Sequence, residues 1–307
     1  MGGRVDVDER RGGGTVVVHH GGLGDGVLIW PLLRALSRRG PVALACRWSG
    51  AKLAGAWIEG VEAVDGESAE FSRLFVGGAA VEAGDALRAR FAAADRVVSF
   101  VSSGRDAWAA NVEALAPRAA RCHVRSRPAS EDPPEPIARF HERQLADQGL
   151  VYEPMDPPLR RAVDAPVVLH PGSGGTEKCW PIERWEALAG ALEGIGRPIA
   201  VALGEAELER WPEGRRKRWA GRYDCYMPAT PLELSRVIAG ASVYVGNDAG
   251  PTHLAAQLGV ATVALFGPTD PRVWGPRGPA VTIIAPRRLR AMDWLPVEAV
   301  VEAIARW

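Results

Sequence analysis

The strongest constraint on the fold is the stretch from Val243 to Trp274, VYVGNDAGPTHLAAQLGVATVALFGPTDPRVW. It opens with a short β-rich run and turns over Gly246 to Pro251. A short helix with an apolar face is predicted from Thr252 to Leu258, and a second apolar run of strand length follows from Val260 to Phe266. A strand, a helix and a strand joined so closely form a crossover unit of a parallel sheet, so the stretch predicts an α/β fold.

Two polar loops, GNDAGPTH and GPTDP, follow the two strands of this unit. Ligands of open parallel sheets bind at the carboxyl ends of the strands, where both loops fall. The first loop also crowds polar side chains around the start of a helix, whose free backbone N–H groups attract an anion. These loops therefore suit a phosphate-bearing ligand. The alternative is that their glycine, asparagine, aspartate and proline residues only make turns.

A glycine-rich segment near the start of the chain gives a second unit of this kind. The run Gly14 to His20 predicts a buried strand, GGLGDG follows it, and Val27 to Leu36 predicts a helix. The spacing differs from GxGxxG, and Asp25 would repel a pyrophosphate, so the loop is not a dinucleotide fingerprint. A carboxylate at a helix start can serve as a general base aimed at a cleft, or it can simply cap the helix. Both interpretations of Asp25 stay open from this stretch alone.

A third loop, PGSGGTEKCWP, follows the predicted strand Val167 to His170. Its glycine N–H groups, the hydroxyls of Ser173 and Thr176 and the ammonium of Lys178 are the parts of a phosphate cradle, although the P-loop pattern GxxxxGK[ST] is absent. The alternative is a lone surface lysine in a loop. After the next strand, Glu205 and Glu207 compete for the hydroxyls of a ribose.

Composition narrows the class of protein. Lys and Arg together number 37, as do Asp and Glu, so no net charge points to nucleic acid. No apolar run approaches the roughly 18 residues of a membrane span. The cysteines lack the spacing of a metal site, which predicts no metal and a reducing compartment; they are Cys46, Cys122, Cys179 and Cys225. A basic cluster could meet an anionic acceptor or form a solvated face; it comprises Arg118, Arg121, Arg125 and Arg127.

Three segments together resemble the heptosyltransferase family, the glycosyltransferases that add heptose in lipopolysaccharide core assembly. They are GGLGDGVLIWPLLRAL, LHPGSGGTEKCWPIERWEAL and VGNDAGPTHLAAQLGVATVALFGPTDP. The resemblance is strongest over Pro166 to Trp274, good at Gly21 to Leu36 and weak between Arg47 and Tyr152. It implies a GT-B-type α/β fold of two Rossmann-like, doubly wound domains that face a central cleft.

The length of 307 residues suits two domains, and the resemblance implies their roles. Residues 1–13 are expected to be a disordered leader. Residues 14–158 would form an N-terminal, acceptor-side Rossmann-like domain, and residues 159–285 a C-terminal domain for the nucleotide-sugar donor. Residues 286–307 would form a C-terminal segment that returns toward the first domain.

The resemblance also implies roles for individual residues. Asp25 matches the family's proposed catalytic base, Thr176 and Lys178 match its diphosphate contacts, and the loop with Asp248 and His253 matches its donor pocket. Asp25 and Lys178 are accordingly predicted to be catalytic, and Gly22, Gly24, Gly267 and Thr269 to form backbone loops. The donor-binding set predicted from the residues and the resemblance together is Ser173, Thr176, Lys178, Glu205, Glu207, Asn247, Asp248, Ala249, Gly250, Thr252 and His253.

The function implied is inverting, metal-independent transfer of a sugar, heptose from ADP-heptose, to a hydroxyl of a glycan or lipopolysaccharide-type acceptor, with no cofactor. We expect a cytoplasmic monomer that binds no nucleic acid and has peripheral contact with the inner face of the membrane. Two alternatives stay open: a nucleotide-sugar epimerase of similar architecture, and a non-catalytic module that binds a sugar nucleotide.

Overall fold

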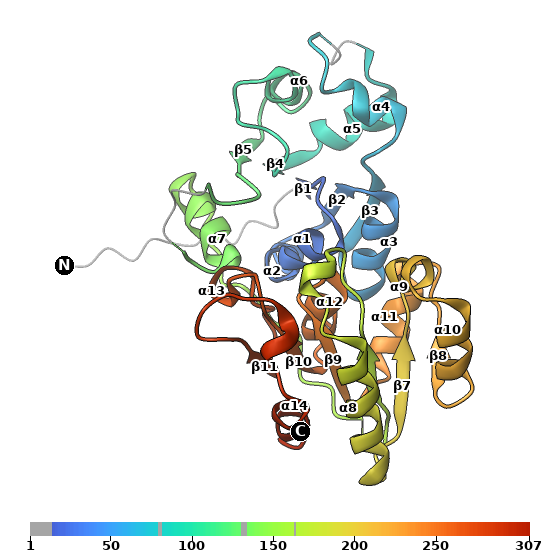
Figure 1. The fold of residues 1–307 in the computed structure, drawn as a ribbon. Helices are drawn as coiled ribbons and strands as arrows, with labels where there is room; N and C mark the ends of the chain where they lie inside the picture. The colour runs from blue at the N-terminus through green and yellow to red at the C-terminus, as the bar shows by residue number, and fades with distance from the viewer. Residues whose placement is uncertain (1–13, 79–81, 130–133, 163) are drawn as a thin grey trace, which may run out of the picture. The chain divides into compact units, whose positions relative to one another are not determined.

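The computed structural model describes residues 14–78, 82–129, 134–162 and 164–307, so the expected leader lies outside the described residues. The chain divides into two compact units, shown as a ribbon in Figure 1. The first unit comprises the described residues of Met1–His20, Pro31–Ser126 and His141–Pro154. The second unit takes Gly21–Trp30, Arg127–Phe140 and Met155–Trp307. The predicted first glycine-rich loop therefore belongs to the second unit from Gly21 onward.

The first unit holds a sheet of parallel strands in the order β3-β2-β1-β4-β5. Its strands are β1 (Gly14–Val18), β2 (Val42–Cys46), β3 (Val61–Asp65), β4 (Ala94–Ser99) and β5 (Ala120–His123). Its helices are α2 (Trp30–Ser37), α3 (Trp48–Trp57), α4 (Ala69–Arg73), α5 (Asp85–Ala92), α6 (Ala107–Leu115) and most of α7 (Ile137–Asp147). Large aromatic side chains fill its core, where the ring centroid of Trp108 lies 5.4 Å from that of Phe71.

The second unit holds a parallel sheet in the order β11-β10-β9-β6-β7-β8. Its strands are β6 (Val167–His170), β7 (Ile199–Ala202), β8 (Asp224–Tyr226), β9 (Val243–Asn247), β10 (Ala261–Leu265) and β11 (Val281–Ile284). Its main helices are α1 (Leu23–Leu28), α8 (Ile182–Gly194), α9 (Glu205–Arg210), α10 (Glu213–Ala220), α11 (Pro231–Ala239), α12 (Gly250–Gln257), α13 (Pro271–Trp274) and α14 (Val297–Ile304). This is the strand order of dinucleotide-binding folds.

Both sheets confirm the predicted doubly wound α/β class. In the second sheet, β6, β9 and β10 are buried along their whole length, which explains why each appears in the sequence as a mainly apolar run. Two helix starts differ from prediction. α1 begins at Leu23, inside the glycine-rich loop, and it stops before Pro31, which has no N–H to continue the helical ladder. α12 begins at Gly250, with Pro251 in the first turn, where an N–H is not needed.

Candidate functional site

The candidate site lies in the second unit, where the order of strands reverses. Strands β6 and β9 are parallel neighbours, with His170 opposite Gly246 in the register. The loops that leave their carboxyl ends therefore start side by side. Open α/β sheets bind ligands at this point because two adjacent strands send their loops in opposite directions and leave a crevice between them.

Asn247 ties these two loops together. Its side chain is completely buried, Nδ2 donates to the carbonyl of Pro171 at 2.7 Å, and Oδ1 accepts from the backbone N–H of Trp180 at 3.1 Å. Trp180 is in turn anchored through Nε1, which donates to the carbonyl of Leu295 at 3.1 Å. Asn247 was predicted to contact the donor directly, but its amide is used by the protein and its visible task is to hold the two loops in place.

Asp248 is the centre of the polar network at these loops. Its Oδ2 accepts from Lys178 Nζ at 2.8 Å and from Thr269 Oγ1 at 2.7 Å, and its Oδ1 lies 3.9 Å from His253 Nε2. Burial alone would raise the pKa of Asp248, but the adjacent His253 and the hydrogen bonds from Lys178 and Thr269 lower it to about 2. The structure thus brings Lys178, Thr269 and His253, from three separate loops, around the carboxylate of Asp248. All four residues were predicted to belong to the site, and the carboxylate stays ionised.

Lys178 keeps part of its side chain exposed, 29%, although its ammonium pairs with Asp248. An ammonium group has three donors, so one bond to Asp248 leaves capacity for an anionic ligand. Thr176, two residues earlier, is exposed. Ser173 faces the other way: it is buried, and its hydroxyl donates to the carbonyl of Asp248 at 3.1 Å. Of the three side chains predicted to form the cradle, Lys178 and Thr176 are therefore the two that are open to a ligand.

Arg210 on α9 fixes the shape of the loop after β6, which contains Ser173 and Gly174. Its Nη1 donates to the carbonyl of Ser173 and its Nη2 to the carbonyl of Gly174, both at 2.9 Å. Arg210 could not be predicted from the sequence, because an arginine on a short polar helix has no distinguishing pattern. Arg210 also lines a hollow of about 220 Å³ beside the loop, together with Thr176 and Glu207.

The two residues predicted to bind a ribose, Glu205 and Glu207, occupy the first turn of α9. Glu207 is buried, its Oε2 accepts from the backbone N–H of Gly204 at 2.7 Å, and it packs against Gly172. Glu207 therefore caps its own helix while it lines the hollow. Glu205 begins α9, and its side chain lies outside the described part of the chain.

The start of α12 packs against the start of α1. Thr252 is buried and its Oγ1 donates to the carbonyl of Asn247 at 2.5 Å, so it closes the loop rather than facing a ligand. Gly24 of α1 and Gly250 of α12 meet at the contact between the two helices. Gly22 is the N-cap of α1, and Ala249 is the N-cap of α12. Gly267, in the loop after β10, packs against Met292.

Asp25 lies in the first turn of α1 and therefore in the same compact unit as the donor loops. Its Oδ2 accepts from the backbone N–H of Gly22 at 3.3 Å and from Arg127 Nη2 at 2.9 Å. Its side chain is 22% exposed. The carboxylate therefore caps the helix and is still open to solvent, and its role as a general base stays a prediction.

The predicted basic cluster divides between the two units. Arg127 belongs to the second unit and pairs with Asp25, whereas Arg121 belongs to the first unit and pairs with Glu113 at 3.0 Å.

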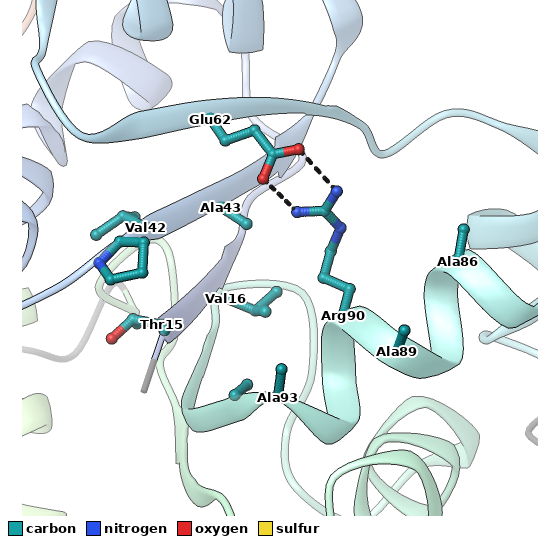
Figure 2. A pocket seen from close by; sticks show the side chains of 12 residues that line it. Thr15, Val16, Val42, Ala43, Glu62, Ala86, Ala89, Arg90 and Ala93 are labelled. Carbon is teal, nitrogen blue, oxygen red and sulfur yellow. Dashed lines mark hydrogen bonds and ion pairs between the residues drawn. The ribbon is translucent and has the colours of Figure 1, made fainter. Parts of the chain in front are cut away.

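A second hollow, of about 390 Å³, lies in the first unit at the amino ends of β1 and β2 (Figure 2). Figure 2 shows Arg90 of α5 reaching the carboxylate of Glu62, to which its two terminal nitrogens donate at 2.6 and 2.8 Å. These hydrogen bonds lower the pKa of Glu62. Apart from this pair, the labelled walls are mainly alanine and valine, and the hollow lies at the opposite end of the strands from a ligand crevice. It is not the candidate site.

The described residues offer neither a metal site nor a membrane-spanning helix. No group of three or more His, Cys, Asp or Glu side chains among them is placed to hold a metal ion. No helix in this part of the chain combines the length and apolar character needed to cross a membrane.

Comparison with known proteins identifies the family. The model of glycosyltransferase family 9, the heptosyltransferases, matches residues 136–293, which include the loops after β6, β9 and β10. The chain belongs to this family. The resemblance noted in the sequence is thereby confirmed.

Relatives in family 9 share sequence with part of this chain. Lipopolysaccharide heptosyltransferase 1 of Salmonella typhimurium is 36% identical over 106 residues, which are 33% of this chain and 32% of that protein. The Pseudomonas aeruginosa protein of the same name is 38% identical over 114 residues, 36% of this chain and 31% of that protein. The matched region thus spans about a third of the length of these curated relatives.

The fold is similar over nearly the whole chain. The solved structure of the E. coli heptosyltransferase WaaC with ADP matches with a TM-score of 0.72 and 20% identity, covering 95% of this chain and 99% of that one. The family 9 protein therefore has a GT-B-type fold, as predicted.

Proposed function

We propose that this family 9 protein is an inverting, metal-independent glycosyltransferase. It moves a sugar, heptose from ADP-heptose, to a hydroxyl of a glycan or lipopolysaccharide-type acceptor. The observation that carries the proposal is the placement of Asp25: its helix packs directly on α12, the helix that follows the Asp248 loop with its Lys178 pair. The second unit thus holds both a carboxylate, Asp25, that suits a base and a cation, Lys178, that suits a partner for the leaving group.

Inversion at the anomeric carbon requires a single displacement, in which the acceptor hydroxyl attacks from the face opposite the leaving diphosphate. The acceptor oxygen forms a bond to the anomeric carbon, the bond from that carbon to the diphosphate oxygen breaks, and the acceptor proton passes to Asp25. The departing ADP gains negative charge, which Lys178 can meet with the donors that Asp248 leaves unused. Because Asp248 stays ionised, it holds the Lys178 ammonium at this position while the charge develops.

Family membership and the names of the relatives support heptose as the sugar and lipopolysaccharide as the acceptor class. A cytoplasmic monomer with peripheral contact at the inner face of the membrane belongs to the same proposal. Light scattering of the purified protein and cell fractionation test these two points.

The decisive experiment incubates the protein with ADP-heptose and a lipopolysaccharide acceptor that lacks heptose, and follows ADP release together with the acceptor's mass. Transfer predicts one heptose added per acceptor. Asp25→Asn should abolish turnover and leave ADP binding within about twofold, because the change removes a base but no donor contact. The matched control Asp224→Asn alters an exposed carboxylate of the same unit and should leave turnover unchanged. Conversion of the donor without an acceptor would instead identify an epimerase, and ADP binding without any turnover a binding module.

A further inference from the structure

The two oxygens of Asp25 have different surroundings. Oδ2 accepts two hydrogen bonds, from the backbone N–H of Gly22 and from Nη2 of Arg127. Oδ1 accepts none from the described residues. A carboxylate with one oxygen held twice cannot rotate freely, because rotation would break both bonds. The free oxygen is therefore kept in one orientation.

Arg127 is itself held on two sides. Its guanidinium carbon lies 5.9 Å from the centroid of the Trp274 ring, while Nη2 reaches Asp25. Trp274 packs against a buried cluster of Leu28, Ile137 and Phe140, so the ring is fixed by residues from α1 and α7. Arginine stacks on aromatic faces and bonds carboxylates at its edge, and this site uses both properties.

The stabilising effect of this pair is expected to be small. The side chain of Arg127 is 65% exposed, and ion pairs between exposed groups contribute little free energy of unfolding. The pair nevertheless joins residues that are 102 positions apart in the chain. Its main consequence is thus the orientation of Asp25.

We infer that Arg127 is a positioning residue for Asp25: it holds Oδ2, so that Oδ1 takes the proton of the acceptor hydroxyl. The inference rests on the proposed transfer reaction and goes beyond it by assigning the two oxygens of the base to separate tasks. The proton moves from the acceptor oxygen to Oδ1, and Arg127 keeps its hydrogen bond to Oδ2.

Variants at position 127 test the inference through turnover. Arg127→Ala should lower kcat about tenfold or more, because a misdirected base costs rate, and should leave the Kd for ADP within about twofold. Arg127→Lys should keep part of the rate, because it restores a donor without the planar stack. Free guanidinium ion at millimolar concentration should restore part of the rate to Arg127→Ala, which a merely structural role would not allow.

Arg222→Ala is the matched control. Arg222 also pairs with a carboxylate, Glu193, and also lies over an aromatic ring, Tyr223, at 5.5 Å. Its removal should leave kcat unchanged. Unchanged kcat in Arg127→Ala, or a loss that neither lysine nor guanidinium ion relieves, would overturn the inference.

A double-mutant cycle separates this inference from the proposed function. The free energy of unfolding of Asp25→Asn, Arg127→Ala and the double variant is measured in urea, with no substrate present. A small but resolvable non-additivity is expected, since the two side chains are in contact although Arg127 is exposed. If the wild-type protein transfers no heptose, the proposed function fails, while additive changes in the cycle would show separately that Arg127 does not hold Asp25.

Discussion

A Cβ atom added to Gly250 would lie 2.9 Å from the backbone nitrogen of Gly24. In the opposite direction, a Cβ atom on Gly24 would lie 3.3 Å from the Cα atom of Gly250. The first turns of α1 and α12 thus pack backbone against backbone, which only residues without a side chain allow. One of these helices, α1, carries Asp25, and the other, α12, directly follows the Asp248 loop. The contact between them therefore fixes the distance between the proposed base and the donor loops.

Gly250→Ala tests this contact. The added methyl group should force the two helices apart, lower stability by about 1–3 kcal/mol and reduce transfer more than ADP binding. Thermal unfolding and the transfer assay measure both effects. Gly190→Ala is the control: a Cβ atom added at this position of α8 would meet open space, so the variant should leave activity unchanged and raise stability by up to about 1 kcal/mol. Equal behaviour of the two variants would contradict the prediction.

Lys178→Ala should weaken ADP binding about tenfold or more, because it removes a charge-assisted hydrogen bond to the diphosphate. It also leaves the buried Asp248 without its nearest cation. Isothermal titration calorimetry gives the Kd directly. Lys217→Ala serves as control, since Lys217 is 75% exposed and pairs with Glu213 within α10. An unchanged Kd in Lys178→Ala would remove Lys178 from the donor site.

Much of the second unit could be predicted from its sequence, because each long element has a clear pattern. The apolar run and glycine-rich loop around β6 and the capped helix after Thr230 are examples. The start of α1 at Leu23, inside GGLGDG, could not be predicted. Glycines disfavour a helix in isolation, and α1 forms there because Gly24 contacts α12, from more than 200 positions away in the chain.

The site could be predicted by residue type but not by orientation. Lys178, Asp248, His253 and Thr269 come together as expected, because parallel strands bring their carboxyl ends to one edge. Ser173, Asn247 and Thr252 were predicted to face a ligand, yet each of them is buried and bonds the backbone. Sequence pattern does not distinguish a polar side chain that closes a loop from one that meets a ligand.

Asn247→Ala should weaken ADP binding and lower the free energy of unfolding by about 1–3 kcal/mol, since the N–H of Trp180 and the carbonyl of Pro171 would lose a buried partner. Asn111→Ala provides a matched comparison in the first unit, where a buried asparagine donates to the carbonyls of Leu74 and Val76. That variant should lose comparable stability and keep the wild-type Kd for ADP. A loss of ADP binding in both variants would point to general unfolding instead.

The depressed pKa of Asp248 predicts a specific acid sensitivity. In the folded protein this pKa is about 2, below the ordinary value of 3.8. The folded state therefore gains stability from the ionised carboxylate, fully above about pH 4, and loses it as pH falls from 4 to 2. The shift corresponds to about 2 kcal/mol.

Asp248→Asn isolates this contribution from other acidic groups, such as Asp106, whose pKa is also lowered to about 2. The difference in the free energy of unfolding between wild type and Asp248→Asn should be constant from about pH 5 to 7 and should shrink by about 2 kcal/mol toward pH 2. Urea unfolding at a series of pH values measures the difference. A difference that stays the same down to pH 2 would mean that Lys178, Thr269 and His253 do not stabilise the charge of Asp248, and the proposed arrangement for the leaving diphosphate would lose its anchor.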